Sequence, residues 1–213
     1  MRRRGGYIAV EGPIGVGKTS LAMALGRELN ARMVLEDAEG NPFLLRFYED
    51  PDKYAFPVQL YFMLARHNQQ RELAQQELFS QATVADYLFA KDRVFARLNL
   101  APEELALYEQ VYSMLDARLL KPDLVVYIAA RAEVLAERLR KRKRDFERYI
   151  SYEYLERVSA AYRDFFFYYD ECPLLVVDSS EIDFVADPED LADLIREIDR
   201  VTAGVQYYVP RKK

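Results

Sequence analysis

The sequence predicts an α/β fold in which helices cover both faces of a parallel β-sheet. Five short apolar segments, rich in Val, Ile, Leu and Tyr, indicate buried strands at residues 7–10, 31–35, 83–87, 124–128 and 174–177. Between them, apolar residues recur at spacings of three and four, which indicates helices over residues 19–29, 57–78, 102–119, 132–143 and 152–169. Because strands alternate with crossover helices, we expect one parallel sheet of five strands.

A last helix is expected from Asp187 to about Val201. Asp187 can cap this helix, Pro188 suits its first position, and Glu189 places an acid in its first turn. The tail at residues 207–213 carries no pattern that predicts a structure.

Length and composition limit the classes of protein to which the chain can belong. Its 213 residues predict a single domain over 1–213, and no segment approaches the ~20 apolar residues that span a bilayer. The net charge of -5 argues against a general nucleic-acid binder. One cysteine, Cys172, excludes an internal disulfide framework, and one histidine, His67, disfavours a His-based metal site. We therefore expect a cytoplasmic protein whose partners are neither nucleic acid nor membrane.

A glycine-rich segment follows the first predicted strand and matches the pattern G-x-x-x-x-G-K-[ST]. Its glycines let backbone N–H groups converge on phosphate oxygens, and the next helix adds the positive end of its dipole. Lys18 can reach the outer phosphates, while the Thr19 hydroxyl can hold Mg²⁺. The residues expected to bind ATP here are Gly12, Pro13, Ile14, Gly15, Val16, Gly17, Lys18, Thr19 and Ser20.

A phosphate loop alone does not distinguish a small-molecule kinase from a GTPase or an ATP-driven machine. The guanine-reading pattern Asn-Lys-x-Asp of GTPases is absent from the sequence. Residues 131–144 hold seven Arg and Lys against two Glu, which gives +5 in an acidic protein. Arg138 and Arg142 share a helix face, and guanidinium groups suit the charge of a transferring phosphoryl group. An arginine-rich lid over about 138–150 is therefore predicted, with a solvated basic face as the alternative.

Gln59 and Arg66 are seven residues apart and share one stripe of a predicted helix, with Phe62 and Met63 between them. This stripe, polar at both ends and apolar in the middle, suits a flat heterocycle with hydrogen-bonding edges. The Gln59 amide can both donate and accept, as a paired contact to a base requires. Arg66 needs a carboxylate partner such as Asp92 if it is buried.

Taken together, these motifs resemble the deoxynucleoside kinases related to deoxycytidine and deoxyguanosine kinase. The resemblance covers residues 12 to about 184 and rests on several motifs in order. These are the Pro-Ile-Gly-Val phosphate loop, Tyr48 eleven residues before Gln59, the Gln59-x₆-Arg66 helix, the Asp92-Arg93 pair, and Arg138-x₃-Arg142-x-Arg144 followed by Glu147.

The resemblance also implies roles. Glu36 resembles the base that accepts the 5′-hydroxyl proton and Asp86 the carboxylate beside Mg²⁺, although either carboxylate suits either role. Lys18 and Arg138 complete the implied catalytic set. The implied base- and sugar-binding residues, besides Glu36, are Tyr48, Gln59, Arg66, Asp92 and Glu147. Those implied for ATP, besides the phosphate loop, are Arg138, Arg142, Arg144, Asp183 and Phe184. A homodimer is implied as well.

The sequence departs from the family pattern where it has Asp86-Tyr87-Leu88 in place of acid-Arg-Ser. The family arginine that helps to bind phosphate near the acceptor is missing, and its replacement is open between Arg93, a lid arginine and no residue. Tyr54 also stands where many relatives carry Trp. These departures are typical of a bacterial branch that favours purine deoxynucleosides.

The predicted function is ATP-dependent phosphorylation of a deoxynucleoside at its 5′-hydroxyl in nucleotide salvage, with deoxyadenosine or deoxyguanosine preferred and deoxycytidine also considered. One alternative is a nucleoside monophosphate kinase, such as one for thymidylate. It needs more cations for the phosphate of its acceptor, and the Gln59 helix supplies Arg66 alone. The other is a regulatory module that binds ATP without transferring phosphate, in which Glu36→Gln changes nothing measurable.

Overall fold

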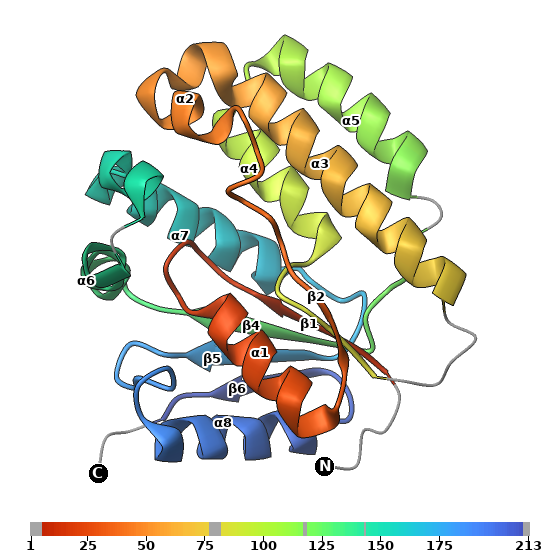
Figure 1. Cartoon of the computed structure of the whole chain (residues 1–213), viewed down its shortest axis with the longest axis vertical. Coiled ribbons are helices and arrows are strands. Elements are labelled where there is room, and N and C mark those ends of the chain that lie inside the picture. Colours follow the sequence, from red (N-terminus) through yellow and green to blue (C-terminus); the bar gives the residue numbers. More distant parts are fainter. Residues whose placement is uncertain (1–5, 77–81, 117–118, 143, 211–213) are drawn as a thin grey trace.

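Parallel strands form one sheet in the order β2-β3-β1-β4-β5-β6 (Figure 1). The computed structural model of the chain describes residues 6–76, 82–116, 119–142 and 144–210. The strands are β1 (Tyr7–Glu11), β2 (Arg32–Val34), β3 (Thr83–Ala85), β4 (Leu124–Ala129), β5 (Leu174–Asp178) and β6 (Val205–Tyr208). The predicted α/β class and all five predicted strand positions are confirmed.

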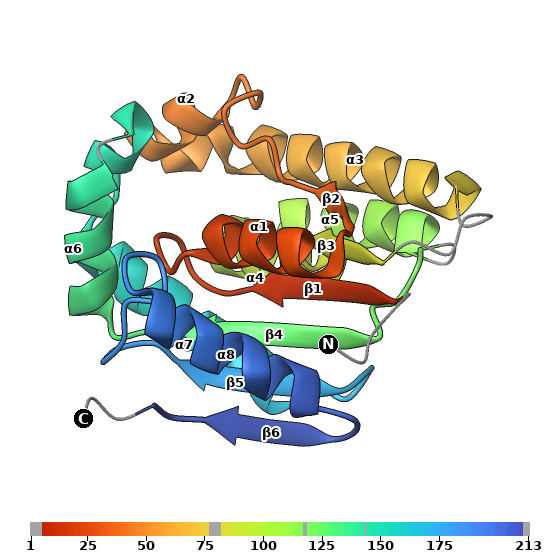
Figure 2. The same cartoon turned by 60° about the horizontal axis from the view of Figure 1, so that its bottom comes forward.

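The expected number of five strands is wrong, because β6 adds a sixth strand within the described residues. It pairs with β5 alone and lies at the edge of the sheet (Figure 2). Three of its four residues are exposed. An edge strand of this kind needs no continuous apolar run, so the strand pattern used for the buried strands does not reveal it.

Eight helices connect the strands in the described part of the chain. They are α1 (Lys18–Leu29), α2 (Leu44–Glu49), α3 (Pro51–Gln76), α4 (Asp92–Asn99), α5 (Pro102–Asp116), α6 (Ala132–Arg142), α7 (Tyr152–Phe167) and α8 (Pro188–Arg200). Short 3-10 turns η1 (Phe89–Lys91) and η2 (Asp145–Tyr149) complete the list. The six predicted helices are present, whereas α2 and α4 are too short to give a clear period. The predicted ends at residues 78 and 143 lie outside the described residues.

Helix α3 begins six residues before the predicted start at Pro57. Pro51 occupies its first position, where proline is well tolerated, and Pro57 lies inside the helix. A proline there removes the hydrogen bond to the carbonyl four residues earlier. That carbonyl belongs to Lys53, which is exposed, so water can satisfy it. The helix therefore continues through Pro57.

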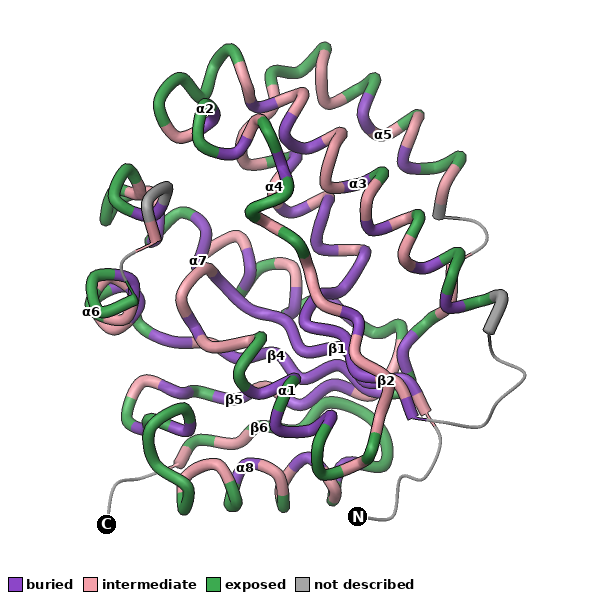
Figure 3. The backbone as a smooth tube through the Cα atoms, viewed as in Figure 1, coloured by how far each residue is buried: buried purple, intermediate pink, exposed green. Residues whose placement is uncertain are grey.

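Both faces of the sheet are buried at the central strands β1 and β4, which are purple in Figure 3. Alternate residues of β1 point to opposite faces: Ile8 and Val10 pack with α1, α6 and α8, while Tyr7 and Ala9 pack with α4 and α7. A further cluster joins α3, α4 and α5 around Met63. It places α3 across from the carboxyl ends of β2 and β3. Among the described helices, none is both long enough and apolar enough to cross a membrane.

Candidate active site

A cavity of about 240 Å³ lies beyond the carboxyl ends of β1, β2 and β3, where open parallel sheets commonly bind ligands. Its wall is formed by the phosphate loop, the residues after β2 and β3, and one stripe of α3. The end of η1, α7 and the segment after α6 complete it. The predicted residues outside the phosphate loop that line it are Glu36, Tyr48, Gln59, Arg66, Asp86, Arg142, Arg144 and Glu147. The predicted residues that do not line it are Asp92, Arg138, Asp183 and Phe184.

The phosphate loop joins β1 to α1 through left-handed backbone at Gly15 and Gly17, with φ of 84° and 103°. A Cβ atom at Gly17 would also lie 2.9 Å from the Phe184 ring, so only glycine fits there. The loop residues that line the cavity are Ile14, Gly15, Gly17, Lys18, Thr19 and Ser20, whereas Gly12, Pro13 and Val16 do not. Val16 is instead fully buried in the core.

The Lys18 ammonium donates to the carbonyl oxygens of Gly12, at 2.8 Å, and Pro13, at 3.2 Å. These bonds hold the cation against the phosphate loop. Burial lowers the pKa of Lys18, and the positive charge of Lys91 lowers it further, to about 8. The Lys18 ammonium is therefore positioned at the phosphate loop, where it can bind a negatively charged ligand.

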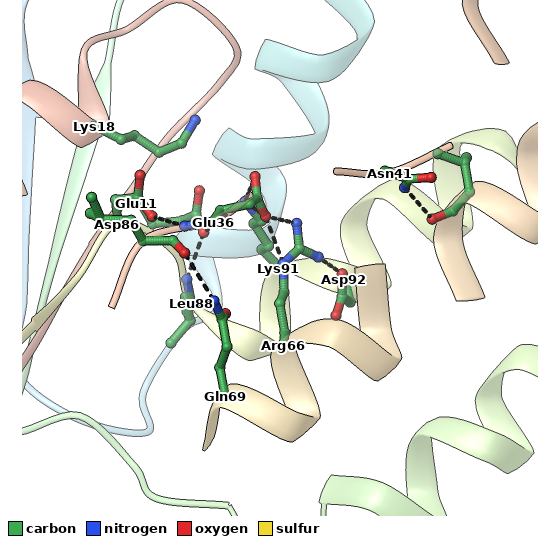
Figure 4. A network of polar contacts seen from close by, with 12 residues as sticks. Glu11, Lys18, Glu36, Asn41, Arg66, Gln69, Asp86, Leu88, Lys91 and Asp92 are labelled. Atoms are coloured by element: carbon green, nitrogen blue, oxygen red, sulfur yellow. Dashed lines mark hydrogen bonds and ion pairs between the residues drawn. The ribbon is translucent and has the colours of Figure 1, made fainter. Parts of the chain in front are cut away.

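Glu36 follows β2 and is the centre of an ion-pair network (Figure 4). Arg66 Nε donates to Glu36 Oε1 at 2.7 Å, and Lys91 Nζ lies 3.3 Å from the same oxygen. Burial by itself would raise the pKa of Glu36, but the positive charges of Arg66 and Lys91 outweigh it and lower the pKa to about 2. The carboxylate is therefore ionised at neutral pH, as a proton acceptor must be.

Arg66 extends from α3 and bridges two carboxylates, Glu36 and Asp92. Its guanidinium also lies over the Phe62 ring, 4.9 Å from the ring centroid. The predicted pairing with Asp92 is present, and Asp92 is completely buried. Asp92 therefore lies behind Arg66 and contacts the cavity through it.

Asp86 follows β3 and connects the phosphate loop to Glu36. The Thr19 hydroxyl donates to Asp86 Oδ2 at 2.6 Å, and the Glu36 backbone N–H donates to Asp86 Oδ1 at 2.7 Å. Asp86 is 3% exposed. A hydroxyl and a carboxylate at one point are the oxygen ligands that Mg²⁺ prefers.

The far end of the cavity holds Gln59, Tyr48 and Glu147. Gln59 is buried on the α3 stripe that carries Arg66. Tyr48 packs edge-on against Tyr154, with ring centroids 6.2 Å apart. Burial raises the pKa of Tyr48, and Tyr154 and the charge of Glu147 raise it further; both predicted sugar-binding residues, Tyr48 and Glu147, line the cavity. Glu147 is itself buried and is paired with Arg142 at 2.6 Å.

The predicted lid arginines occupy different environments. Arg142 and Arg144 line the cavity. Arg138 instead donates to the carbonyl oxygens of Val16, Ser179 and Ile182 and to the Ser179 hydroxyl, at 2.9–3.3 Å. In this structure it joins α6 to the phosphate loop and to the segment after β5. The structure therefore does not bring Arg138 to the cavity with the other two.

Asp183 and Phe184 also lie away from the cavity. Asp183 accepts hydrogen bonds from the backbone N–H groups of Val185 and Ala186 and thereby closes a turn. Phe184 is 2% exposed and its ring packs against Gly17 from below the phosphate loop. The contacts of Phe184 are those of a core residue that supports the loop.

We expect Phe184→Ala to lower the free energy of unfolding by about 3–5 kcal/mol, because it removes a fully buried ring. Val185→Ala is the matched control, since Val185 is 58% exposed and should change little. Denaturant unfolding of both variants measures the difference. A Phe184→Ala protein of unchanged stability with a raised KM for ATP would instead support contact with the adenine.

Two buried residues of the site, Glu11 and Lys91, were not predicted. Glu11 ends β1 and accepts hydrogen bonds from the backbone N–H groups of Gly12 and Leu88, both at 2.8 Å, and from the Tyr162 hydroxyl at 3.0 Å. An acid directly after an apolar strand was a signal for Glu11. No local pattern marks Lys91, because its burial depends on how η1 packs against α3 and α4.

The fold and the site define a P-loop phosphotransferase, with a phosphate loop after the first strand and a carboxylate at its hydroxyl. A family model described as deoxynucleoside kinase matches residues 8–203. The chain is 34% identical to the deoxyguanosine kinase of Bacillus subtilis (strain 168) over 189 residues, which cover 86% of this chain and 91% of the relative. It is 35% identical to the deoxyadenosine kinase of Dictyostelium discoideum over 198 residues, which cover 90% and 78%.

A solved structure of deoxyadenosine kinase from M. mycoides with bound dATP has the same fold. Its TM-score is 0.77 at 24% identity, and the match covers 91% of this chain and 99% of that one. The chain belongs to the deoxynucleoside kinase family. It is a kinase that phosphorylates deoxynucleosides with ATP, and the predicted resemblance and activity are confirmed.

Proposed function

We propose that the preferred acceptor is a purine deoxynucleoside, deoxyadenosine or deoxyguanosine. The observation that carries the proposal is Gln59, which is 4% exposed and lines the cavity. Within the described part of the chain, no hydrogen bond engages its amide. Gln59 lines the cavity and an amide can both donate and accept, so the site favours a flat ligand that carries a donor and an acceptor. The names of the relatives at 34% and 35% identity, which refer to deoxyguanosine and deoxyadenosine, support a purine.

The proposed reaction moves the γ-phosphoryl group of ATP in line to the 5′-oxygen. A bond forms between the 5′-oxygen and the γ-phosphorus, and the bond from that phosphorus to the β,γ-bridging oxygen breaks. Glu36 receives the 5′-hydroxyl proton, while Lys18 and the loop N–H groups hold the phosphates. Glu36 lies next to Asp86, and Asp86 contacts the phosphate loop. This position supports the role of Glu36 as the base.

Magnesium is proposed to accompany ATP at Thr19 and Asp86. Both residues present oxygen atoms, and the 2.6 Å between the Thr19 hydroxyl and Asp86 Oδ2 supports a site in which one ion meets both groups. When bound, Mg²⁺ supplies positive charge that offsets the charge of the triphosphate. Asp86 in turn holds the backbone N–H of Glu36 and so keeps the base next to the phosphate loop.

The remaining roles follow from position in the cavity. Arg66, backed by Asp92, would contact the edge of the base beyond Gln59. Tyr48 and Glu147 would hold the 3′-hydroxyl. A lid over about 138–150, within a single domain of residues 1–213, would bring Arg142 and Arg144 to the phosphates, and Arg138 would join them only by exchanging its present carbonyl partners.

Two further expectations, a homodimer from the resemblance and the cytoplasm from the composition, belong to the same proposal. A homodimer is proposed, and the exposed rings of Phe167 and Tyr168, 77% and 80% exposed at the end of α7, support an interface there. The cytoplasm is the proposed compartment, as the single cysteine Cys172 suggests.

The test is steady-state phosphorylation of deoxyadenosine, deoxyguanosine, deoxycytidine, thymidine and thymidylate, each with ATP and with or without Mg²⁺. We expect a purine deoxynucleoside to have the highest kcat/KM, no reaction without Mg²⁺, and no reaction of thymidylate. Preferred turnover of a pyrimidine nucleoside would contradict the base preference. Turnover of thymidylate alone would mean that the acceptor pocket holds a monophosphate.

A further inference from the structure

A lysine that the proposed reaction does not use lies inside the cavity. Lys91 is the last residue of η1, is 2% exposed and lines the cavity. Lysine side chains are almost never fully buried without a partner, because the ammonium loses its hydration. The burial of Lys91 therefore calls for a role in the site.

Both carboxylates beside Lys91 have further partners of their own. Glu11 already accepts three hydrogen bonds, and Glu36 is already paired with Arg66. Lys91 Nζ is 3.7 Å from Glu11 Oε2 and 3.3 Å from Glu36 Oε1, and it donates one hydrogen bond, to Glu36 Oε2 at 3.4 Å. An ammonium has three N–H donors, and these distances leave Lys91 able to donate to a ligand in the cavity.

Lys91 lies on the acceptor side of the site. Figure 4 shows it beside Glu36 and Arg66. Among the described residues, Asp86 joins Glu36 to the phosphate loop by hydrogen bonds, and Lys91 lines the same cavity as Lys18 and Glu36. The ammonium therefore lies beside the proposed base, in the cavity that the phosphate loop also lines.

No other described cation close in sequence to Asp86 has this position. Arg93 is two residues further along but pairs with Glu109 at 3.0 Å and stacks over Tyr112. It does not line the cavity. The segment between β3 and α4 thus brings one cation, Lys91, to the reacting groups.

We propose that Lys91 is a catalytic residue whose ammonium binds the transferring phosphoryl group on the acceptor side, an inference that rests on the proposed function. While the bond from the 5′-oxygen to the γ-phosphorus forms and the bond to the bridging oxygen breaks, the hydroxyl proton passes to Glu36. Lys91 keeps its protons throughout. After the transfer, the charge of Lys91 lies beside the phosphate group of the deoxynucleoside 5′-monophosphate.

Lys91→Met tests this role because it removes the charge and keeps the length of the side chain. With the deoxynucleoside that the wild-type enzyme phosphorylates fastest, we expect kcat to fall about 100-fold, the loss typical of one preorganised donor. Calorimetric titration should show the Kd of the 5′-monophosphate raised at least about tenfold. The Kd of the nucleoside, which has no phosphate, should change less than about threefold, whereas a purely structural role would move both constants alike.

Arg93→Met is the matched control, since it removes a cation two residues away that faces α5, and its kcat should match that of the wild type. If Lys91→Met does not fold, Lys91→Gln keeps a donor beside Glu36 without the charge and carries the same expectations. A kcat within threefold of the wild type, or equal weakening of nucleoside and monophosphate, would overturn the role of Lys91.

The two proposals fail differently. Wild-type preference for a pyrimidine nucleoside would overturn the purine preference and leave the Lys91 comparison intact. Wild-type enzyme that phosphorylates no nucleoside would overturn both.

Discussion

Glu36→Gln should lower kcat about 1,000-fold while leaving the Kd of ATP nearly unchanged. The amide cannot accept the 5′-hydroxyl proton, but it keeps the shape of the side chain and can accept from Arg66. The Kd should hold because Lys18 and Thr19, which are proposed to bind the phosphates and Mg²⁺, do not contact the Glu36 carboxylate in any described hydrogen bond. Steady-state kinetics and calorimetric titration with ATP measure the two effects.

Glu28→Gln is the matched control, because Glu28 is an exposed acid on α1 and should have wild-type kcat. Glu36→Gln with kcat within tenfold of the wild type would transfer the role of base to Asp86, the second carboxylate at the loop. Equal loss of ATP binding would instead point to a structural role for the ion-pair network.

Lys18→Met should lower kcat/KM for ATP by about 100- to 1,000-fold. Its ammonium is held at the phosphate loop by the carbonyls of Gly12 and Pro13, so its charge is oriented before ATP arrives. The loss should appear in kcat as well as in KM, because the charge on the transferring group is greatest in the transition state. Initial rates at varied ATP and saturating nucleoside measure both constants.

Lys53→Met provides the comparison for Lys18, since Lys53 is exposed on α3 over the Tyr54 ring. Its kcat/KM for ATP should equal that of the wild type. A Lys18→Met enzyme with nearly normal kcat and a raised KM would show that Lys18 binds ATP equally in the ground state and the transition state.

Much of the fold was predictable from the sequence because its signals are local. Buried strands of a parallel sheet have continuous apolar runs, and five of them were found within two residues of their ends. The phosphate loop was predictable for the same reason, since its glycines, lysine and hydroxyl are consecutive. The edge strand β6 was not, because exposed strands at a sheet edge share their composition with loops.

The candidate site was predictable where one helix or one charge pair carries the pattern. Gln59 and Arg66 lie on one stripe of α3, and the need of a buried arginine for a carboxylate indicated Asp92. The spacing of the lid arginines likewise predicted Arg142 and Arg144 as site residues, and both line the cavity. Arg138 has the same spacing, but its guanidinium meets the free carbonyls of Ser179 and Ile182, which no local pattern reveals.

By itself, the sequence determined the α/β class, the phosphate loop, the helix that carries Gln59 and Arg66, and the family to which the chain belongs. Only the tertiary structure decided that Phe184 supports the loop from the core and that Lys91, rather than Arg93, is the cation that the β3–α4 segment brings to Glu36. The reason is physical: a residue's role as ligand-binding group or packing group depends on which distant side chains share its desolvated space. Glu36 and Lys91 are 55 positions apart, and only the folded chain brings the Lys91 ammonium to Glu36 Oε2, at 3.4 Å.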